Sequence, residues 1–177
     1  MAVAQMYLQG EEVRQDFGEA AKWYRRAADK SYSPAQVALA NMYVQRRGVP
    51  VDYSEAMRLC QAAAKSKLGA GMTCIGLLYQ GGLGVPRDYE SAAKWYTAAA
   101  KMRDPQAMHY LGALYSKGLG VSPNKVLAYT WYLLAAGWGD KGAEQDAEVL
   151  KTQLESRQIA KAAQAAKDFL TKNKFPH

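Results

Sequence analysis

The stretch AMHYLGALYSKGLGVSPNKVLAYTWYLLAA, residues 107–136, decides the fold of this chain. Its first half carries apolar side chains such as Leu111 and Leu114 at helical spacing. A turn with Gly118 and Gly120 follows, and glycine readily adopts the left-handed backbone that ends a helix. The second half, rich in alanine and aromatic residues, predicts a second helix that packs closely on its neighbours.

The same pattern recurs every 36 residues along the chain, without an insertion. The recurring positions are Tyr7, Tyr43, Tyr79 and Tyr115; Val13, Val49, Val85 and Val121; Asp16, Asp52, Asp88 and Asn124; and the alanine pairs that begin at Ala27, Ala63, Ala99 and Ala135. We therefore predict helix-hairpin repeats over residues 1–34, 35–70, 71–106 and 107–142, followed by capping helices over 143–177. Together they form one solenoid domain.

Two details of the repeat concern its second helix. The side chain of Asp16 or Asp52 is expected to cap the free amides at the helix start. Glutamate follows three residues later, at Glu19 and Glu55, which predicts reciprocal capping boxes. Trp95 is expected to be a central wedge between successive hairpins.

This pattern resembles the Sel-1-like repeat (SLR) family, which is related to the tetratricopeptide repeats. Residues 107–136 follow the family motif with one change, Asn124 in place of aspartate, and residues 71–100 follow it nearly as well. The second repeat departs more, with Arg46 in place of glycine and Cys60 in place of tyrosine. The resemblance implies an all-α, right-handed solenoid whose first helices line the concave side. It also implies an adaptor role, without naming a partner.

The two ends of the chain carry separate expectations. Met1 falls inside the first helix of repeat 1. We therefore expect that an upstream segment, either a further repeat or a leader peptide, has been removed. Near the other end, Ser156 is expected to cap a last helix with a polar outer face. The chain is expected to be soluble, bacterial, and either cytoplasmic or, if a leader was removed, periplasmic or secreted.

Composition limits the chemistry that this chain can perform. Hydrophobic residues make up 49% of the 177 residues, with no run of about 18 apolar residues that would cross a membrane. The net charge of +7 is spread along the chain, so nucleic-acid or polyanion binding through Arg46, Arg47 and the lysines of the last helix is the less favoured alternative. No nucleophile–base pair or metal-ligand spacing is visible, so we predict no enzyme activity, no cofactor and no metal; a hydrolase-like enzyme is the remaining alternative. The glycine loops lack the Lys-Ser/Thr ending of a phosphate-binding loop and serve as turns.

Cys60 and Cys74 leave two alternatives open. They lie 14 residues apart on consecutive antiparallel helices, at matching heights. Packed helices lie about 8–10 Å apart, whereas a disulfide needs Cα atoms within about 7 Å. Free, buried cysteines are therefore favoured. The family resemblance implies the alternative, a disulfide between the same two helices.

The candidate partner-binding residues are those of the first helices that the repeat does not use for packing. Their types differ between repeats at a fixed position, which is typical of a surface free to specialise. They are Val37, Asn41 and Val44; Thr73, Leu77 and Gln80; and His109, Ala113 and Ser116. Trp138, in a turn, either packs on the C-terminal cap or is an exposed anchor. We thus predict a protein or peptide partner on the concave face, for a chain that is a monomer or weak dimer.

Overall fold

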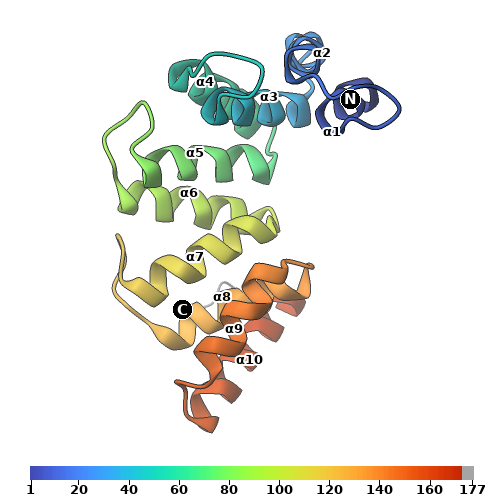
Figure 1. Ribbon diagram of the computed structural model, residues 1–177. Coiled ribbons are helices and arrows are strands. Elements are labelled where there is room, and N and C mark those ends of the chain that lie inside the picture. The colour runs from blue at the N-terminus through green and yellow to red at the C-terminus, as the bar shows by residue number, and fades with distance from the viewer. Residues whose placement is uncertain (173–177) are drawn as a thin grey trace. The chain divides into compact units, whose positions relative to one another are not determined.

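The computed structural model describes residues 1–172, and every regular element in this range is an α-helix (Figure 1). The helices are α1 (Ala2–Gln9), α2 (Phe17–Asp29), α3 (Ser33–Gln45), α4 (Tyr53–Lys65), α5 (Gly69–Gly81), α6 (Tyr89–Lys101), α7 (Pro105–Lys117), α8 (Lys125–Gly137), α9 (Lys141–Lys151) and α10 (Ser156–Lys172). Odd-numbered helices are called A helices below and even-numbered ones B helices. The A helices α3, α5, α7 and α9 begin 36 residues apart, so the all-α repeat prediction is confirmed.

The starts of the B helices α2 and α4 are set by local hydrogen bonds. The Asp16 side chain accepts from the Glu19 amide at 2.9 Å, and Asp52 accepts from the Glu55 amide at 2.9 Å. The return half of the predicted capping box at Asp16 is wrong, because the Asp16 amide donates to the Tyr7 carbonyl at 2.9 Å instead. The repeated tyrosine therefore supplies a backbone acceptor to the next cap.

Glycine is required where the A-to-B turn meets the preceding B helix. A Cβ on Gly48, whose φ is +70°, would lie 2.1 Å from the Phe17 carbonyl oxygen. A Cβ on Gly120, whose φ is +67°, would lie 2.3 Å from the Tyr89 carbonyl carbon. The close backbone contact excludes a larger residue at both positions. Positive φ alone only disfavours one, because Glu12 has a φ of +63° at the same position of the first repeat.

The chain folds as two compact units, Met1–Asp88 (unit 1) and Tyr89–His177 (unit 2). In unit 1, α1 to α5 pack in sequence order, and α3 also packs on α5. Its core holds Ala20, Tyr24, Leu39, Leu59 and Ile75, all at most 2% exposed.

A disulfide joins Cys60 of α4 to Cys74 of α5 within that core. Their Cα atoms lie 5.8 Å apart, so the preference for free cysteines is wrong. The expected separation of packed helices did not take Gly71 into account. A Cβ on Gly71 would lie 2.7 Å from both the Ala63 Cβ and the Ala64 amide nitrogen. The absence of that Cβ lets α4 and α5 approach closely enough for the bond.

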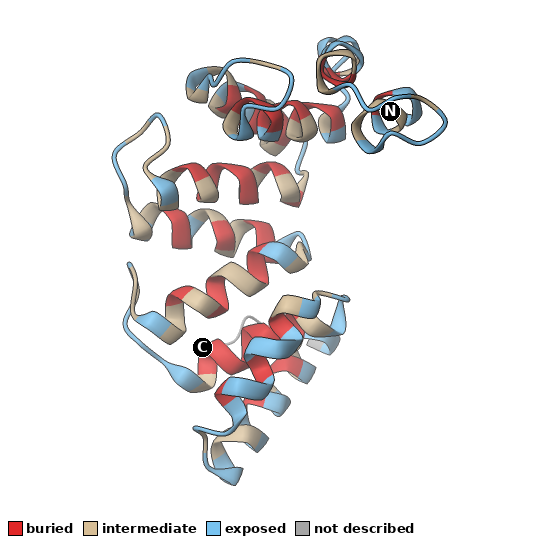
Figure 2. Ribbon diagram, viewed as in Figure 1, coloured by how far each residue is buried: buried red, intermediate tan, exposed pale blue. Residues whose placement is uncertain are grey.

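Unit 2 is built around α8, which contacts α7, α9 and α10. Trp131 of α8 is 2% exposed and meets Phe169 of α10 edge to face, with ring centroids 5.8 Å apart. Figure 2 shows α8 largely buried, whereas α9 carries many exposed residues, as expected of a terminal cap. Trp95 is only half-buried, so the expectation that it is the central wedge is wrong. The buried aromatic residues of unit 2 include Trp131 on α8 and Tyr96 on α6 instead. The predicted cap range ends in residues 173–177, which lie outside the described part.

Candidate functional site

The A-helix face of unit 1 is carried by the neighbouring helices α3 and α5. Asn41 is exposed there; the half-buried members of the predicted set are Val37, Val44, Leu77 and Gln80. Thr73 differs from the rest, because it is 1% exposed and its hydroxyl donates to the Gly69 carbonyl at 3.2 Å. Thr73 therefore presents no surface in this structure, and the other five residues do.

The A-helix face of unit 2 is hollowed between α7 and α9. The hollow, called the α7–α9 pocket below, has a volume of about 200 Å³. Its lining residues are Ala113, Ser116, Lys117, Tyr132, Asp146, Val149, Leu150 and Gln153. Two of the predicted partner-binding residues, Ala113 and Ser116, thus meet at one concave site. Val149 is 63% exposed, which leaves an apolar side chain at its rim.

His109 links α7 to α9 beside this pocket. Its Nδ1 lies 3.1 Å from Asp140 Oδ1, and its Nε2 lies 2.9 Å from Asp146 Oδ2. Gly142 makes room for the ring, since a Cβ there would lie 2.8 Å from His109 Cε1. Both ring nitrogens are thus engaged by carboxylates of the same chain. This arrangement joins the cap to α7 and leaves neither nitrogen facing a serine or cysteine nucleophile.

Tyr132 forms the floor of the α7–α9 pocket. Burial, together with the nearby Asp146 carboxylate, raises the pKa of Tyr132 to about 12, despite a hydrogen bond with Ser116. The phenol is protonated at neutral pH, as an ordinary tyrosine is, and its hydroxyl is already engaged with Ser116. The pocket combines this neutral hydroxyl with the Asp146 carboxylate and the apolar Val149.

Trp138 lies at another edge of unit 2, in the turn between α8 and α9. It is 46% exposed, and the Arg103 guanidinium lies 6.0 Å from its ring centroid. The contact between α8 and the last helix is made instead by Trp131, seven residues earlier. The two alternatives for Trp138 were packing on the C-terminal cap and exposure as an anchor. In the structure its ring is exposed.

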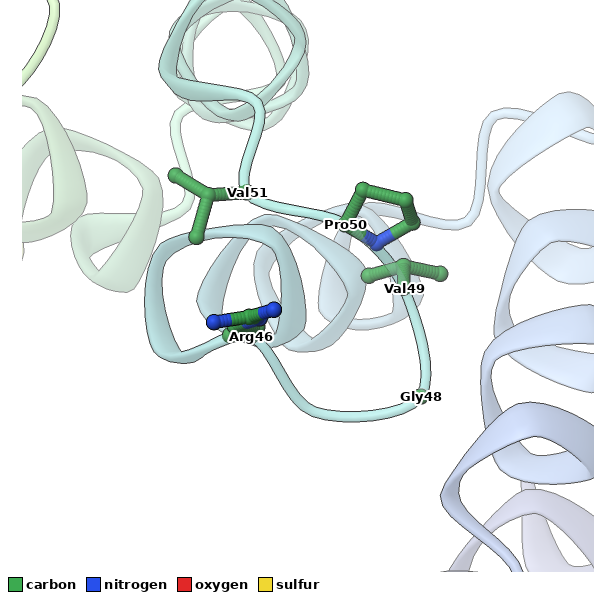
Figure 3. Close-up of a pocket in the computed structure, with 5 residues that line it drawn as sticks. All are labelled: Arg46, Gly48, Val49, Pro50 and Val51. Carbon is green, nitrogen blue, oxygen red and sulfur yellow. The ribbon is translucent and has the colours of Figure 1, made fainter.

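A second depression lies on the loop that leaves α3 in unit 1 (Figure 3). It is shallow, with a volume of about 610 Å³, and is lined by Arg46, Gly48, Val49, Pro50 and Val51. Arg46 lies on one side of it, and Val49, Pro50 and Val51 lie on the other. The neighbouring Arg47 stacks over the Phe17 ring, with its guanidinium carbon 5.7 Å from the ring centroid. The arginine doublet is therefore split between this depression and an aromatic contact.

The contribution of α9 to the pocket differs from the prediction. Asp146 and Val149 come from residues 143–177, which are predicted only to cap the solenoid. A signal was present, because Val149 lies 36 residues after Ala113 and so occupies the same position of the repeat. The carboxylates at His109 had no such signal, because they come 31 and 37 residues later in the chain.

Residues 1–172 lack the features of two other kinds of site. Within this range, no three His, Cys, Asp or Glu side chains are grouped so that they could hold a metal ion. None of the described helices is long and apolar enough to cross a membrane.

A family model of the Sel1 repeat matches four segments, residues 1–32, 33–68, 70–104 and 105–137. The chain belongs to the Sel1 repeat family. Sel1 repeat proteins generally mediate protein–protein interaction and are typically non-enzymatic scaffolds. A search of curated proteins by sequence gives no match.

Solved Sel1 repeat structures are similar to this chain. A protective antigen of uropathogenic Escherichia coli with an SLR fold is 36% identical, with a TM-score of 0.70 over 82% of this chain, which spans 31% of that antigen. A Sel1 repeat protein from Oxalobacter formigenes is 30% identical, with a TM-score of 0.76 over 98% of this chain and 71% of that one. Cysteine rich protein B of Helicobacter pylori is 22% identical, with a TM-score of 0.58 over 76% of this chain and 96% of that protein. The Sel1 solenoid fold class is thereby confirmed.

Proposed function

We propose that this chain is a non-catalytic adaptor that binds a peptide or protein partner on the faces of its A helices. The observation that carries the proposal is the α7–α9 pocket, because positions that vary between repeats, Ala113 and Ser116, line a concave surface there. Variable residues on a constant scaffold are typical of repeat proteins that bind partners. Mixed apolar and polar lining also suits a peptide, whose side chains and backbone need both kinds of contact.

A pull-down from lysate of the source organism at physiological salt tests this proposal. The tagged chain is compared with a unit 1 variant, Val37→Glu with Leu77→Glu, and a unit 2 variant, Ala113→Glu with Val149→Glu. Each variant places two carboxylates on one A-helix face. A matched control, Ser54→Glu with Gln61→Glu, adds the same charge at exposed positions of the B helix α4.

The expected result is one protein recovered by the parent and the control and lost by one of the face variants. Circular dichroism of all four chains establishes that the substitutions leave the helices formed. The complex is then measured with the purified partner by calorimetry. Equal recovery of that protein by all four chains would remove the A-helix faces from the proposal.

The disulfide supports an oxidising compartment as the place of action. Cys60 is fully buried and bonded to Cys74, and such bonds persist mainly outside the reducing cytosol. Alkylation of unfolded chains taken directly from cells would show no free thiol if the compartment is oxidising. Two labelled cysteines per chain would place the protein in a reducing compartment.

A further inference from the structure

An exposed apolar and basic surface lies at the edge of unit 2 where its B helices end and its A helices begin. We define this surface, the unit 2 turn edge, as Lys101, Met102 and Arg103, together with Trp138 and Lys141. Met102 is 45% exposed and Trp138 is 46% exposed. Exposed tryptophan, methionine and arginine are the types enriched at protein interfaces.

The repeat does not require apolar residues at these positions. Met102 and Trp138 lie 36 residues apart, and the equivalent positions of unit 1 hold Lys30 and Ser66. All four residues follow the last residue of a B helix or cap it. Because lysine and serine serve the same turn elsewhere, the folding of the turn does not explain the two large apolar side chains of unit 2.

The charges of this edge that face solvent are positive. Lys101, Arg103 and Lys141 are exposed. The acids of the same turns, Asp104 and Asp140, are half-buried and accept the Ala107 and Ala143 amides at 2.8 Å. Asp140 also lies 3.1 Å from His109 Nδ1. The two carboxylates are thus directed to groups of their own chain, whereas the three basic residues are exposed.

Arg103 and Trp138 form an ordered pair within this surface. The guanidinium carbon lies 6.0 Å from the ring centroid, within the range of a cation–π contact. A guanidinium held over a ring keeps its N–H groups in one plane, where they can donate to a carboxylate in two places. Such pre-ordering lowers the entropy that binding would otherwise cost.

From this surface we infer a docking point for an acidic segment of a partner protein that carries at least one large apolar side chain. The apolar side chain lies against Trp138 and Met102, and neighbouring carboxylates pair with Arg103, Lys101 and Lys141. The inference rests on the proposed adaptor function and adds the chemistry of the partner and a surface distinct from the α7–α9 pocket.

Selection from a random library of displayed peptides of about a dozen residues tests the inference on the full chain. The library is first depleted on the Trp138→Ala variant and then enriched on the parent chain. The enriched peptides are expected to contain Asp or Glu next to Trp, Phe, Leu or Ile. Enrichment of basic peptides, or of none that depends on Trp138, overturns the inference.

Fluorescence anisotropy with one selected peptide gives the quantitative test. Trp138→Ala and Arg103→Glu are each expected to weaken binding by about tenfold or more. Trp23→Ala is the matched control, because Trp23 in unit 1 is 36% exposed and also lies beside an arginine, Arg26, at 4.7 Å. Lys67→Glu changes the unit 1 residue equivalent to Arg103. Both controls are expected to bind the peptide as tightly as the parent does. Equal weakening by Trp23→Ala would contradict specific binding at the unit 2 turn edge.

The pocket variant Ala113→Glu with Val149→Glu separates this inference from the proposed function. It is expected to bind the selected peptide with unchanged affinity, whatever it does to partner capture. If this variant loses peptide binding and Trp138→Ala does not change the affinity, the acidic segment binds in the pocket and the inference is overturned.

Discussion

The same two positions of the repeat make different contacts between helices in unit 1 and in unit 2. In unit 1, Cys60 and Cys74 form a disulfide between α4 and α5. In unit 2, the residues 36 positions later are Tyr96 and Tyr110, whose rings stack with centroids 5.3 Å apart. One backbone template thus holds a covalent bond between small side chains or a contact between large ones. The position determines which helices meet, and the side chains determine how.

A neighbouring residue explains why unit 1 has a disulfide and unit 2 has stacked rings where the two helices meet. Gly71 in unit 1 leaves no Cβ between α4 and α5, whereas its counterpart in unit 2 is Ala107. Two stacked tyrosine rings fill the space between α6 and α7, and burial raises the pKa of both Tyr96 and Tyr110. Unit 1 therefore relies on a cross-link at this position and unit 2 on aromatic packing.

The largest effect is expected from breaking the aromatic core of unit 2. Trp131→Ala should lower the free energy of unfolding by about 3–5 kcal/mol, because Trp131 is 2% exposed and packs on Phe169. Trp95→Ala, at the same repeat position but half-buried, should cost about half as much. Urea denaturation followed by circular dichroism measures both. Equal losses would mean that the two tryptophans share one environment.

Removing the cross-link of unit 1 comes next. Cys60→Ala with Cys74→Ala should cost about 3 kcal/mol, as expected for closing a loop of 14 residues in the unfolded chain. Reducing agent should destabilise the parent similarly and leave the double variant unchanged. Hydrogen exchange should rise in α4 and α5 and stay constant in α7 and α8. Protection that is the same in the parent and the reduced chain would show that the bond does not hold unit 1 together.

Exchanging the residues opposite the junctions sharpens the comparison. Gly71→Ala should cost about 1–3 kcal/mol, because the new Cβ would overlap the α4 backbone near Ala63 and Ala64. It should also slow disulfide formation, measured by quenched thiol alkylation during refolding. Ala107→Gly should cost only about 1 kcal/mol, the helix-propensity difference. If Gly71→Ala costs no more than Ala107→Gly, close approach is not the reason for glycine at this site.

The smallest effect concerns an ion pair on the surface of unit 1. The hydrogen bond from Arg58, at 2.6 Å, lowers the pKa of Glu55, so the stabilisation exists above pH about 4.5 and is lost as pH falls through the lowered pKa. Arg58→Ala should cost about 0.3–0.5 kcal/mol at pH 7 and nothing near pH 2. Lys94→Ala in unit 2 removes a pair whose two side chains are both about 70% exposed and should cost less at either pH. Urea titrations at the two pH values compare the variants, and a cost for Arg58→Ala that does not change with pH would exclude the ion pair as its source.

Much of the candidate site was predictable from repeat positions alone. Ala113 and Ser116 were placed on an A-helix face, and the structure places both in the α7–α9 pocket. Thr73, at the repeat position of Val37 and His109, is buried, because position on a helix does not report how closely the next helix covers it. Val149 could have been found by continuing the period into the cap, whereas the two carboxylates at His109 could not.

The helix boundaries and the 36-residue period could be predicted from the amino-acid sequence alone. These features depend on interactions within a few residues, such as the Asp16 cap and the left-handed turn at Gly118, and they repeat every 36 residues. The packing of the helices was needed to show that Cys60 bonds Cys74, that His109 meets Asp140 and Asp146, and that Trp138 is exposed. Those outcomes depend on the distance between helices, which is set by the volumes of side chains on both partners and not by the periodicity of either one.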